Sequence, residues 1–139
     1  MDEYTNTGAY LRILWDELRF NMEEQLKERG FDDVSPSHGW IFHNTKKEGS
    51  RITELAAIAK ITKQSMSALV AQLEESGYVK KKIDPTDKRA WLLVLTAKGE
   101  KVKQAGHEIN FQFETKWEQK LGAKEYKQLR QLLMKLSER

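Results

Sequence analysis

Apolar side chains recur at steps of three and four near both ends of the sequence, which predicts amphipathic helices there. Near the N-terminus a helix is expected from Gly8 to Arg29, and Gly30 follows as a stop. Its apolar positions, which share one face, are Leu11, Trp15, Leu18, Met22 and Leu26. Near the C-terminus the same periodicity predicts two further helices over residues 97–120 and 123–137, which Gly122 separates.

Shorter periodic segments lie between these ends, and then the period changes. Ser35 and Pro36 are a cap and a first-turn proline for a second helix. After Gly77 the residues favour strands, and the cluster Asp84-Pro85-Thr86-Asp87 predicts a turn, in a hairpin loop longer than the tightest type. The expected helices cover residues 35–49, 53–60 and 62–76, and the expected strands cover 78–83 and 89–95. The predicted fold is mostly α with a small β-hairpin.

Two of the short helices are joined by only about two residues, so they must cross steeply, which requires small side chains at the crossing. Ala56 and Ala59 meet that requirement. Ile61 is expected to fill the space between the helices, and Met66 to cover it. Lys60 stands at the turn where many such motifs have glycine, which costs backbone strain if the position is left-handed. The pattern is typical of a helix-turn-helix.

The second helix of this motif begins with hydrogen-bonding side chains, Thr62-Lys63-Gln64-Ser65 and then Ser67. A recognition helix presents its N-terminal residues to base edges in the major groove, and its helix dipole attracts phosphate. The plainer interpretation is a capped helix with a solvated face. For any one of these residues the two interpretations compete, whereas the group as a whole favours DNA.

The hairpin is basic, with Lys80, Lys81 and Lys82 on its first strand and Lys88 and Arg89 at the start of its second. Residues 51–103 hold eleven Lys and Arg against six Asp and Glu, whereas the rest of the chain is mildly acidic. A basic ribbon after a recognition helix is a wing that can follow the DNA backbone or enter the minor groove. A lysine-rich edge that blocks aggregation would explain the lysines but not the turn cluster.

The sequence Asp84-Pro-Thr-Asp-Lys-Arg-Ala, followed by an apolar strand and Leu95-Thr-Ala-Lys-Gly, resembles the wing of the MarR (multiple antibiotic resistance regulator) family of winged helix-turn-helix regulators. The Asp-x-Arg signature of that family falls on Asp87 and Arg89. The resemblance implies that Asp87 braces the wing by pairing with arginine and that Arg89 reaches the minor groove. Ala68 departs from the pattern, because family members often carry arginine there.

The resemblance also implies a homodimer in which the first and last helices of two chains interlock. It divides the chain into an N-terminal dimerisation helix (1–34), a winged helix-turn-helix DNA-binding lobe (35–95) and C-terminal dimerisation helices (96–139). The residues agree, since four leucines near the end need a partner to cover them, although packing on the first helix of the same chain would also serve. These leucines are Leu129, Leu132, Leu133 and Leu136.

Many members of that family bind small, often phenolic, effectors between the dimerisation helices and the DNA-binding lobe. Trp15, His38 and Trp40 are candidates to line such a pocket, although each tryptophan could equally be ordinary core. His38 and His43 are five residues apart, so a helix would not place both on one face. We therefore expect no metal and no cofactor.

Several functional classes are excluded at this stage. The chain has no cysteine, no signal-peptide pattern at Met1 to Gly8 and no apolar run near the ~20 residues of a membrane span, so a cytoplasmic protein without membrane partners is expected. No catalytic motif occurs, so no enzyme is expected.

We therefore expect a transcriptional regulator, on resemblance a repressor, that binds a pseudo-palindromic operator in double-stranded DNA as a homodimer and is released by a small aromatic effector. The alternative is a winged-helix module that binds protein without specific DNA binding. The expected DNA-binding residues are Arg51, Thr62, Lys63, Gln64, Ser65, Ser67, Lys82, Asp87, Lys88 and Arg89.

Overall fold

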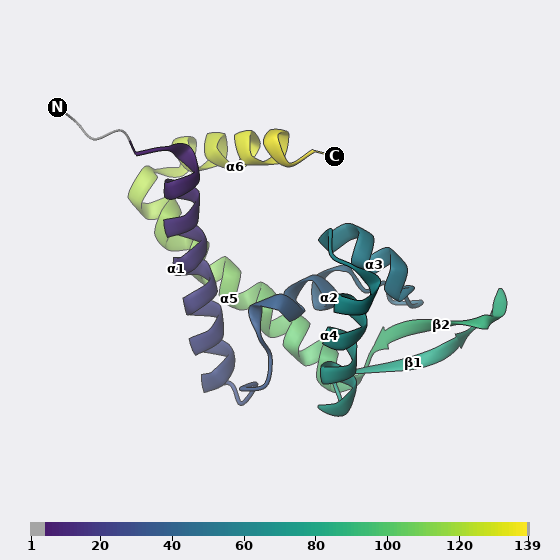
Figure 1. Cartoon of the computed structure of the whole chain (residues 1–139). Coiled ribbons are helices and arrows are strands. Elements are labelled where there is room, and N and C mark those ends of the chain that lie inside the picture. Colours follow the sequence, from purple (N-terminus) through teal and green to yellow (C-terminus); the bar gives the residue numbers. More distant parts are fainter. Residues whose placement is uncertain (1–4, 139) are drawn as a thin grey trace.

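The computed structural model describes residues 5–138, and helices dominate it (Figure 1). In chain order the elements are α1 (Thr7–Glu28), the short 3-10 helix η1 (Pro36–His38), α2 (Gly39–Asn44), α3 (Ile52–Ala59), α4 (Lys63–Glu75), β1 (Val79–Asp84), β2 (Asp87–Leu95), α5 (Ala97–Leu121) and α6 (Ala123–Ser137). The prediction of a mostly α fold with one β-hairpin is confirmed. Within the described range, no helix has the length and apolar character needed to cross a membrane.

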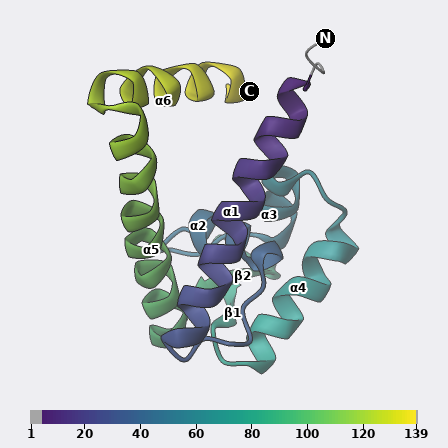
Figure 2. The ribbon, with the colours of Figure 1, turned by 90° about the vertical axis from the view of Figure 1, so that its left-hand side faces the viewer.

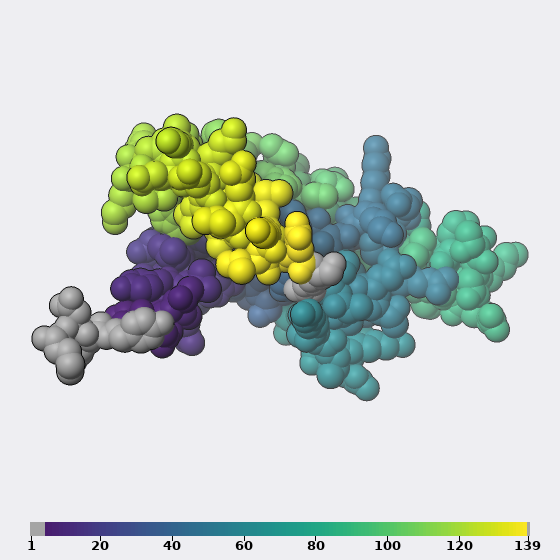
Figure 3. Space-filling model, turned by 90° about the horizontal axis from the view of Figure 1, so that it is seen from above, coloured from purple at the N-terminus to yellow at the C-terminus, as the bar shows by residue number. Residues whose placement is uncertain are grey.

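The long helices α1 and α5 pack on one another, and the short middle elements gather at one end of them (Figures 1 and 2). Side-chain caps start both helices: Asn6 accepts from the Ala9 backbone N–H at 2.8 Å, and Thr96 accepts from that of Gly99 at 3.2 Å. Gly122, with φ +86°, lets the chain turn sharply into α6. Figure 3, seen from above, shows α6 (lime to yellow) over the half of the molecule that holds α1, and the hairpin at the opposite end.

The middle elements share one core with the C-terminal end of α1 and the N-terminal half of α5. Tyr78 is fully buried at its centre, where its ring meets Phe31 and Phe42 edge-on. Gly99 passes so close to Tyr78 that a Cβ would lie 2.1 Å from the Tyr78 carbonyl oxygen, so only glycine fits there. The other large buried side chains include Leu26, Ile41, Leu55, Met66, Val70, Leu73, Val79, Leu93, Val102 and Ile109.

The second predicted helix is shorter than expected, because α2 ends at Asn44 rather than near Glu48–Gly49. The Thr45 hydroxyl donates to the Ile41 carbonyl at 2.6 Å, which closes the last turn. The chain then extends so that Ser50 pairs with Leu93 through two backbone hydrogen bonds of 2.9 and 2.8 Å. This short bridge ties the outer edge of β2 to the helix-turn-helix.

The hairpin turn is also tighter than predicted, because only Pro85 and Thr86 separate the strands. The pairing runs in register from Val79↔Leu95 to Ile83↔Trp91 and then jumps to Asp84↔Asp87. Residues 88–90 therefore bulge out of the ladder beside the turn. The outer end of the hairpin is an irregular tip that carries two of the basic residues.

The helix-turn-helix forms as predicted, except for the position of Ile61. Ala56 and Met66 are buried at the crossing, but Ile61 is 37% exposed and does not fill the space between the helices. Its backbone N–H instead bonds to the Ala56 carbonyl, which ends α3. Along α1, Leu26 is buried, whereas Leu11 and Trp15 of the predicted apolar face are exposed in the single chain.

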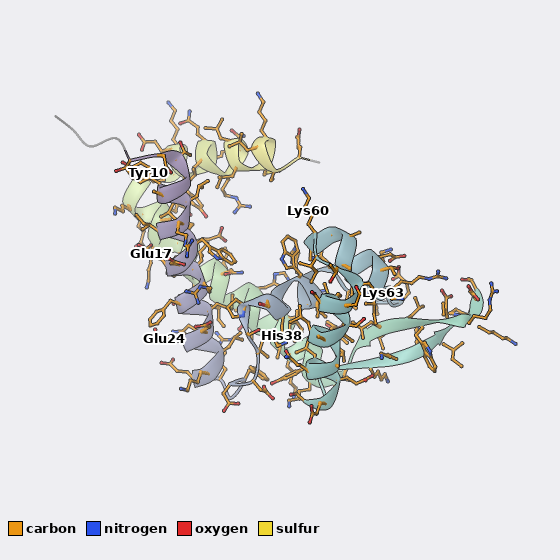
Figure 4. All side chains as sticks on the ribbon, viewed as in Figure 1. Tyr10, Glu17, Glu24, His38, Lys60 and Lys63 are labelled. Atoms are coloured by element: carbon orange, nitrogen blue, oxygen red, sulfur yellow. The ribbon has the colours of Figure 1, made fainter. Side chains whose placement is uncertain are left out.

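Lys60 adopts the left-handed conformation, with φ 56° and ψ 43°, and its side chain projects into solvent (Figure 4). Lys60→Gly is expected to stabilise the fold by about 0.5–1 kcal/mol, because relief of the Cβ clash exceeds the entropy cost of glycine. Thermal unfolding should show a melting temperature raised by a few degrees. Lys60→Ala, which keeps the Cβ, is the matched control, and an equal gain in both variants would contradict the strain.

Candidate nucleic-acid interface

The N-terminal end of α4 is open to solvent, and its side chains divide into two groups. The Thr62 hydroxyl accepts from the Ser65 backbone N–H at 3.0 Å and donates to the Ser65 hydroxyl at 2.9 Å, so these two residues cap the helix. Lys63 and Gln64 are exposed beside this cap, as Figure 4 shows for Lys63. Ser67, one turn further on, is half-buried. The freest hydrogen-bonding groups at this helix end are therefore Lys63 and Gln64.

The hairpin projects from the body of the molecule and carries its cations into solvent (Figure 1). Arg89 has a side chain that is 92% exposed, and its Nε lies 3.3 Å from Oδ1 of Asp87. The same oxygen accepts from the Arg89 backbone N–H at 3.1 Å. Asp87 thus holds the base of Arg89 while the guanidinium points outward. Lys82 and Lys88 are exposed on the same hairpin.

A second acidic residue, which sequence analysis did not single out, organises the tip. Asp84 is buried, and its Oδ2 accepts from Arg51 at 2.8 Å while its Oδ1 accepts from the Thr86 backbone N–H and hydroxyl. Hydrogen bonds from Arg51 and then from Thr86 lower the pKa of the Asp84 carboxyl to about 2. Arg51, which was predicted to contact DNA, therefore forms an ion pair with Asp84 and links the start of α3 to the wing.

A cavity of about 340 Å³ separates the terminal helices from this lobe. Its wall is mostly apolar, with Arg19, Glu23, Lys103 and Glu114 among its charged members. Of the residues predicted to line an effector pocket, Trp15 lines this cavity. His38 and Trp40 do not: His38 is buried behind the wall, and Trp40 lies elsewhere with nearly half of its surface exposed. The remaining lining residues are Leu18, Met22, Leu26, Val34, Ser35, Pro36, Gly39, Phe42, His43, Val102, Gly106, His107 and Asn110.

Comparison with known sequences identifies the family. A sequence model described as the MarR family matches residues 32–90. Over 97 residues the chain is 32% identical to the HTH-type transcriptional regulator BilQ of Clostridium symbiosum, a match that covers 70% of this chain and 67% of BilQ. The chain belongs to the MarR family of transcriptional regulators. The expectation that it is not an enzyme is thereby confirmed.

Solved structures agree on the fold. The reduced form of MarR from E. coli matches with a TM-score of 0.81 at 19% identity, covering 99% of this chain and 100% of that one. The MepR–DNA complex of S. aureus matches with a TM-score of 0.78 at 20% identity, covering 96% and 97%. The predicted winged helix-turn-helix is therefore confirmed, with α3 and α4 as the helix-turn-helix and the hairpin as the wing.

In this MarR-family regulator, buried His38 connects the cavity wall to the recognition helix α4. Its Nδ1 accepts from the Ser35 backbone N–H at 3.0 Å, and its Nε2 lies 2.9 Å from Oε1 of Gln72 on α4. With Nδ1 accepting, Nε2 carries the proton and donates to Gln72. Ser35 itself lines the cavity. Figure 4 shows His38 between α1 and α4.

The other two histidines meet at the cavity rim, where the rings of His43 and His107 lie 6.1 Å apart between centroids. Residues 5–138 include no cluster of three or more His, Cys, Asp or Glu side chains placed to hold a metal ion. This pair is thus a polar edge of the cavity.

Acid is expected to destabilise the fold through His38. Burial lowers the pKa of its imidazole below the ordinary value, and hydrogen bonding to Gln72 only partly opposes this. As pH falls through about 6.5, the unfolded chain binds this proton before the folded chain does, so the free energy of unfolding decreases. Urea unfolding between pH 8 and 5.5 should show this loss, and His38→Asn should flatten it. His43→Asn, at an exposed site, is the control; an unchanged slope in His38→Asn would contradict the assignment.

Proposed function

We propose that this chain is a repressor that binds a pseudo-palindromic operator in double-stranded DNA as a homodimer, acting in the cytoplasm. The observation that carries the proposal is the joint exposure of Lys63 and Gln64 at the start of α4 and of Arg89 on the wing. MepR, which has this fold, was solved as a DNA complex. The alternative, a protein-interaction module, would leave the cations of the wing without a role.

The proposed contacts follow from the hydrogen-bonding groups that each side chain leaves unpaired. Gln64 reads a base, because its amide can donate to and accept from adenine at once. Lys63 holds phosphate, and the Ser65 hydroxyl, which accepts from Thr62 within the cap, donates to a neighbouring phosphate at the positive end of the helix. Ser67 is a secondary contact, because it is half-buried. On the wing, Arg89 enters the minor groove, and Lys82 and Lys88 bind backbone.

Arg51 and Asp87 act mainly by orienting the wing. Arg51 bonds to buried Asp84, so a phosphate contact would use the part of its guanidinium that stays exposed. Asp87 carries a negative charge, which DNA repels. Asp87 therefore contributes to binding by aligning Arg89. Loss of either residue should therefore weaken DNA binding by loosening the hairpin tip.

The homodimer is supported by apolar surface that the single chain leaves open at its two ends. α6 leaves the body of the molecule (Figure 2), and Leu132, Leu133 and Leu136 are exposed on it, whereas Leu129 is half-buried. Monomeric proteins rarely expose so much contiguous apolar surface. We propose residues 1–34 and 96–139 as the dimerisation parts and 35–95 as the DNA-binding lobe; residues 1–4 and 139 lie outside the described range. The exposed apolar residues there include Tyr10, Leu11, Ile13, Trp15, Leu132, Leu133, Met134 and Leu136.

The cavity supports release by a small aromatic effector that contacts Trp15. Its volume lies in the range of small-molecule sites, and its apolar wall carries a few polar groups. The cavity contacts both α1 and the segment before α2. A bound effector would therefore shift the DNA-binding lobe relative to the dimerisation helices. Calorimetric titration with salicylate as an aromatic probe tests this: Trp15→Ala should abolish the binding heat, and heat that survives would place the effector elsewhere.

Selection of bound fragments from the host genome tests the proposed function as a whole. Two-fold protein symmetry requires two half-sites about 34 Å apart, or a multiple of that spacing. Enrichment of a pseudo-palindrome upstream of genes whose transcription rises on deletion of the regulator would support a repressor. Recovery of fragments without any shared sequence would favour the protein-interaction alternative.

Gln64→Ala is expected to relax base preference at one position in each half-site, costing about 1–3 kcal/mol against the matching base pair. Binding to unrelated DNA should stay nearly unchanged, since no charge is lost. Binding-site selection with the variant measures this, and circular dichroism checks the fold. Lys63→Ala is the control that should weaken all sequences evenly. If Gln64→Ala returns the wild-type preference at every position, base reading belongs to Ser67 or Thr62.

A further inference from the structure

The wing carries an exposed apolar pair that the basic residues do not explain. Ile83 on β1 and Trp91 on β2 lie directly opposite each other in the hairpin and are 54% and 55% exposed. Directly opposed residues share one face of a sheet, and so do residues two positions apart along a strand. This apolar pair therefore shares its face with Leu93, which is buried in the core. The core face of the hairpin thus continues outward beyond the helices that cover it.

Trp91 is also free to bind. Among residues 5–138 its indole N–H has no hydrogen-bond acceptor, and its ring stacks on no other ring or cation. The pair lies next to the bulge at residues 88–90, which carries Arg89. An exposed tryptophan offers a large apolar surface at low conformational cost together with one donor.

We propose that Trp91 and Ile83 pack on the deoxyribose faces of the DNA strand that borders the minor groove, with the indole N–H donating to a phosphate oxygen. The inference rests on the proposed DNA binding and adds an apolar positioning contact to it. It commits to DNA because the hairpin that carries the pair is rich in cations, and lysine is depleted at protein interfaces. The DNA backbone alternates phosphate charge with apolar sugar, which matches an apolar pair among cations. Lys81 shares the face of the pair, Lys80 and Lys82 lie on the opposite face, and Lys88 and Arg89 belong to the bulge beside it.

Because sugars are the same in every sequence, the contact should hold the wing in place without selecting bases. Its loss should weaken binding to a random duplex and to a selected operator by the same factor. It should also leave the dependence on salt unchanged, since no charged group that releases counterions is removed. These two properties separate an apolar contact from both a base reader and a phosphate clamp.

The test uses the full chain and a random-sequence duplex of about 30 base pairs, long enough for two half-sites. Trp91→Ala is expected to weaken binding about tenfold, and Ile83→Ala about threefold, in fluorescence anisotropy across a range of salt. Trp91→Phe should stay within about threefold of the wild type, because most of the aromatic surface remains. Lys81→Ala, two cross-strand pairs inward on the same face, is the matched control; it should lower the salt slope by about one unit.

A second measurement guards against a variant that merely misfolds. In the wild-type chain labelled with 5-fluorotryptophan, fluorine NMR reports the four tryptophans, and Trp91→Phe assigns one resonance. That resonance should shift when the duplex is added. The inference would be overturned if that resonance did not shift. It would also be overturned if Trp91→Ala bound DNA with unchanged affinity while Arg89→Ala still weakened binding. Either result would leave the proposed function standing. If Arg89→Ala also has no effect, the proposed function fails first.

Discussion

Replacing Arg89 by alanine is expected to weaken operator binding by about ten- to a hundredfold, because it removes a charge-assisted contact of about 1.5–3 kcal/mol. The Arg89 side chain is 92% exposed and already oriented by Asp87, so little of this energy is spent on ordering it. The salt slope should fall by about one unit. Anisotropy titrations at several salt concentrations measure both quantities. Asp87→Ala should act in the same direction with a smaller effect.

Lys101→Ala supplies the control for Arg89→Ala, since it removes an exposed cation from α5 rather than from the hairpin. Its affinity and salt slope should match those of the wild type. Thermal unfolding should show that Arg89→Ala is as stable as the wild type, because the side chain packs on nothing. Unchanged affinity and unchanged salt slope in Arg89→Ala would mean that the hairpin is not a DNA-binding wing.

The double variant Leu132→Asp/Leu136→Asp is expected to convert the protein into a monomer. Both leucines are exposed in the single chain, and each would contribute about 1.5–3 kcal/mol when buried between two chains. Two copies of two leucines would therefore account for much of a micromolar dimer. Sedimentation velocity at micromolar concentration measures the change. A monomer contacts one half-site, so operator affinity should fall by several orders of magnitude.

Gln128→Asp/Gln131→Asp is the matched control, because it adds the same two charges to α6 at exposed polar positions. It should remain a dimer, and far-ultraviolet circular dichroism should be unchanged in both variants. If the leucine variant sediments as a dimer, α6 is not part of the interface, and its exposed leucines must meet something else.

The elements of the fold were predictable where local signals are strong. Periodic apolar residues, caps such as Thr62 and Thr96, and glycine stops marked every helix, since these signals act within a few residues. The boundaries that failed depend on distant partners. α2 stops early because Ser50 must reach Leu93, a residue more than forty positions away. No local pattern encodes that pairing.

The same holds for the candidate site: features that depend on neighbouring residues could be predicted from the sequence, whereas contacts between distant residues could not. The residues at the start of α4 and on the wing could be proposed as DNA contacts because charge, capping and turn chemistry are visible along the chain; that they contact DNA stays a prediction. Asp84 was missed as a brace because its partner Arg51 lies in a different element, although an Asp before a Pro-Thr turn was a usable signal. His38 was predicted to line the cavity, but it turns away because Gln72 of α4 supplies its hydrogen-bond partner.

Sedimentation of the wild-type chain with an operator fragment selected from the host genome, combined with footprinting, tests the central claim most directly. The proposed function predicts two chains on each duplex and two protected segments about 34 Å apart, or a multiple of that spacing, related by approximate two-fold symmetry. A single chain bound tightly to one half-site would contradict the dimer. Failure to enrich any sequence from the genome would contradict specific DNA binding altogether.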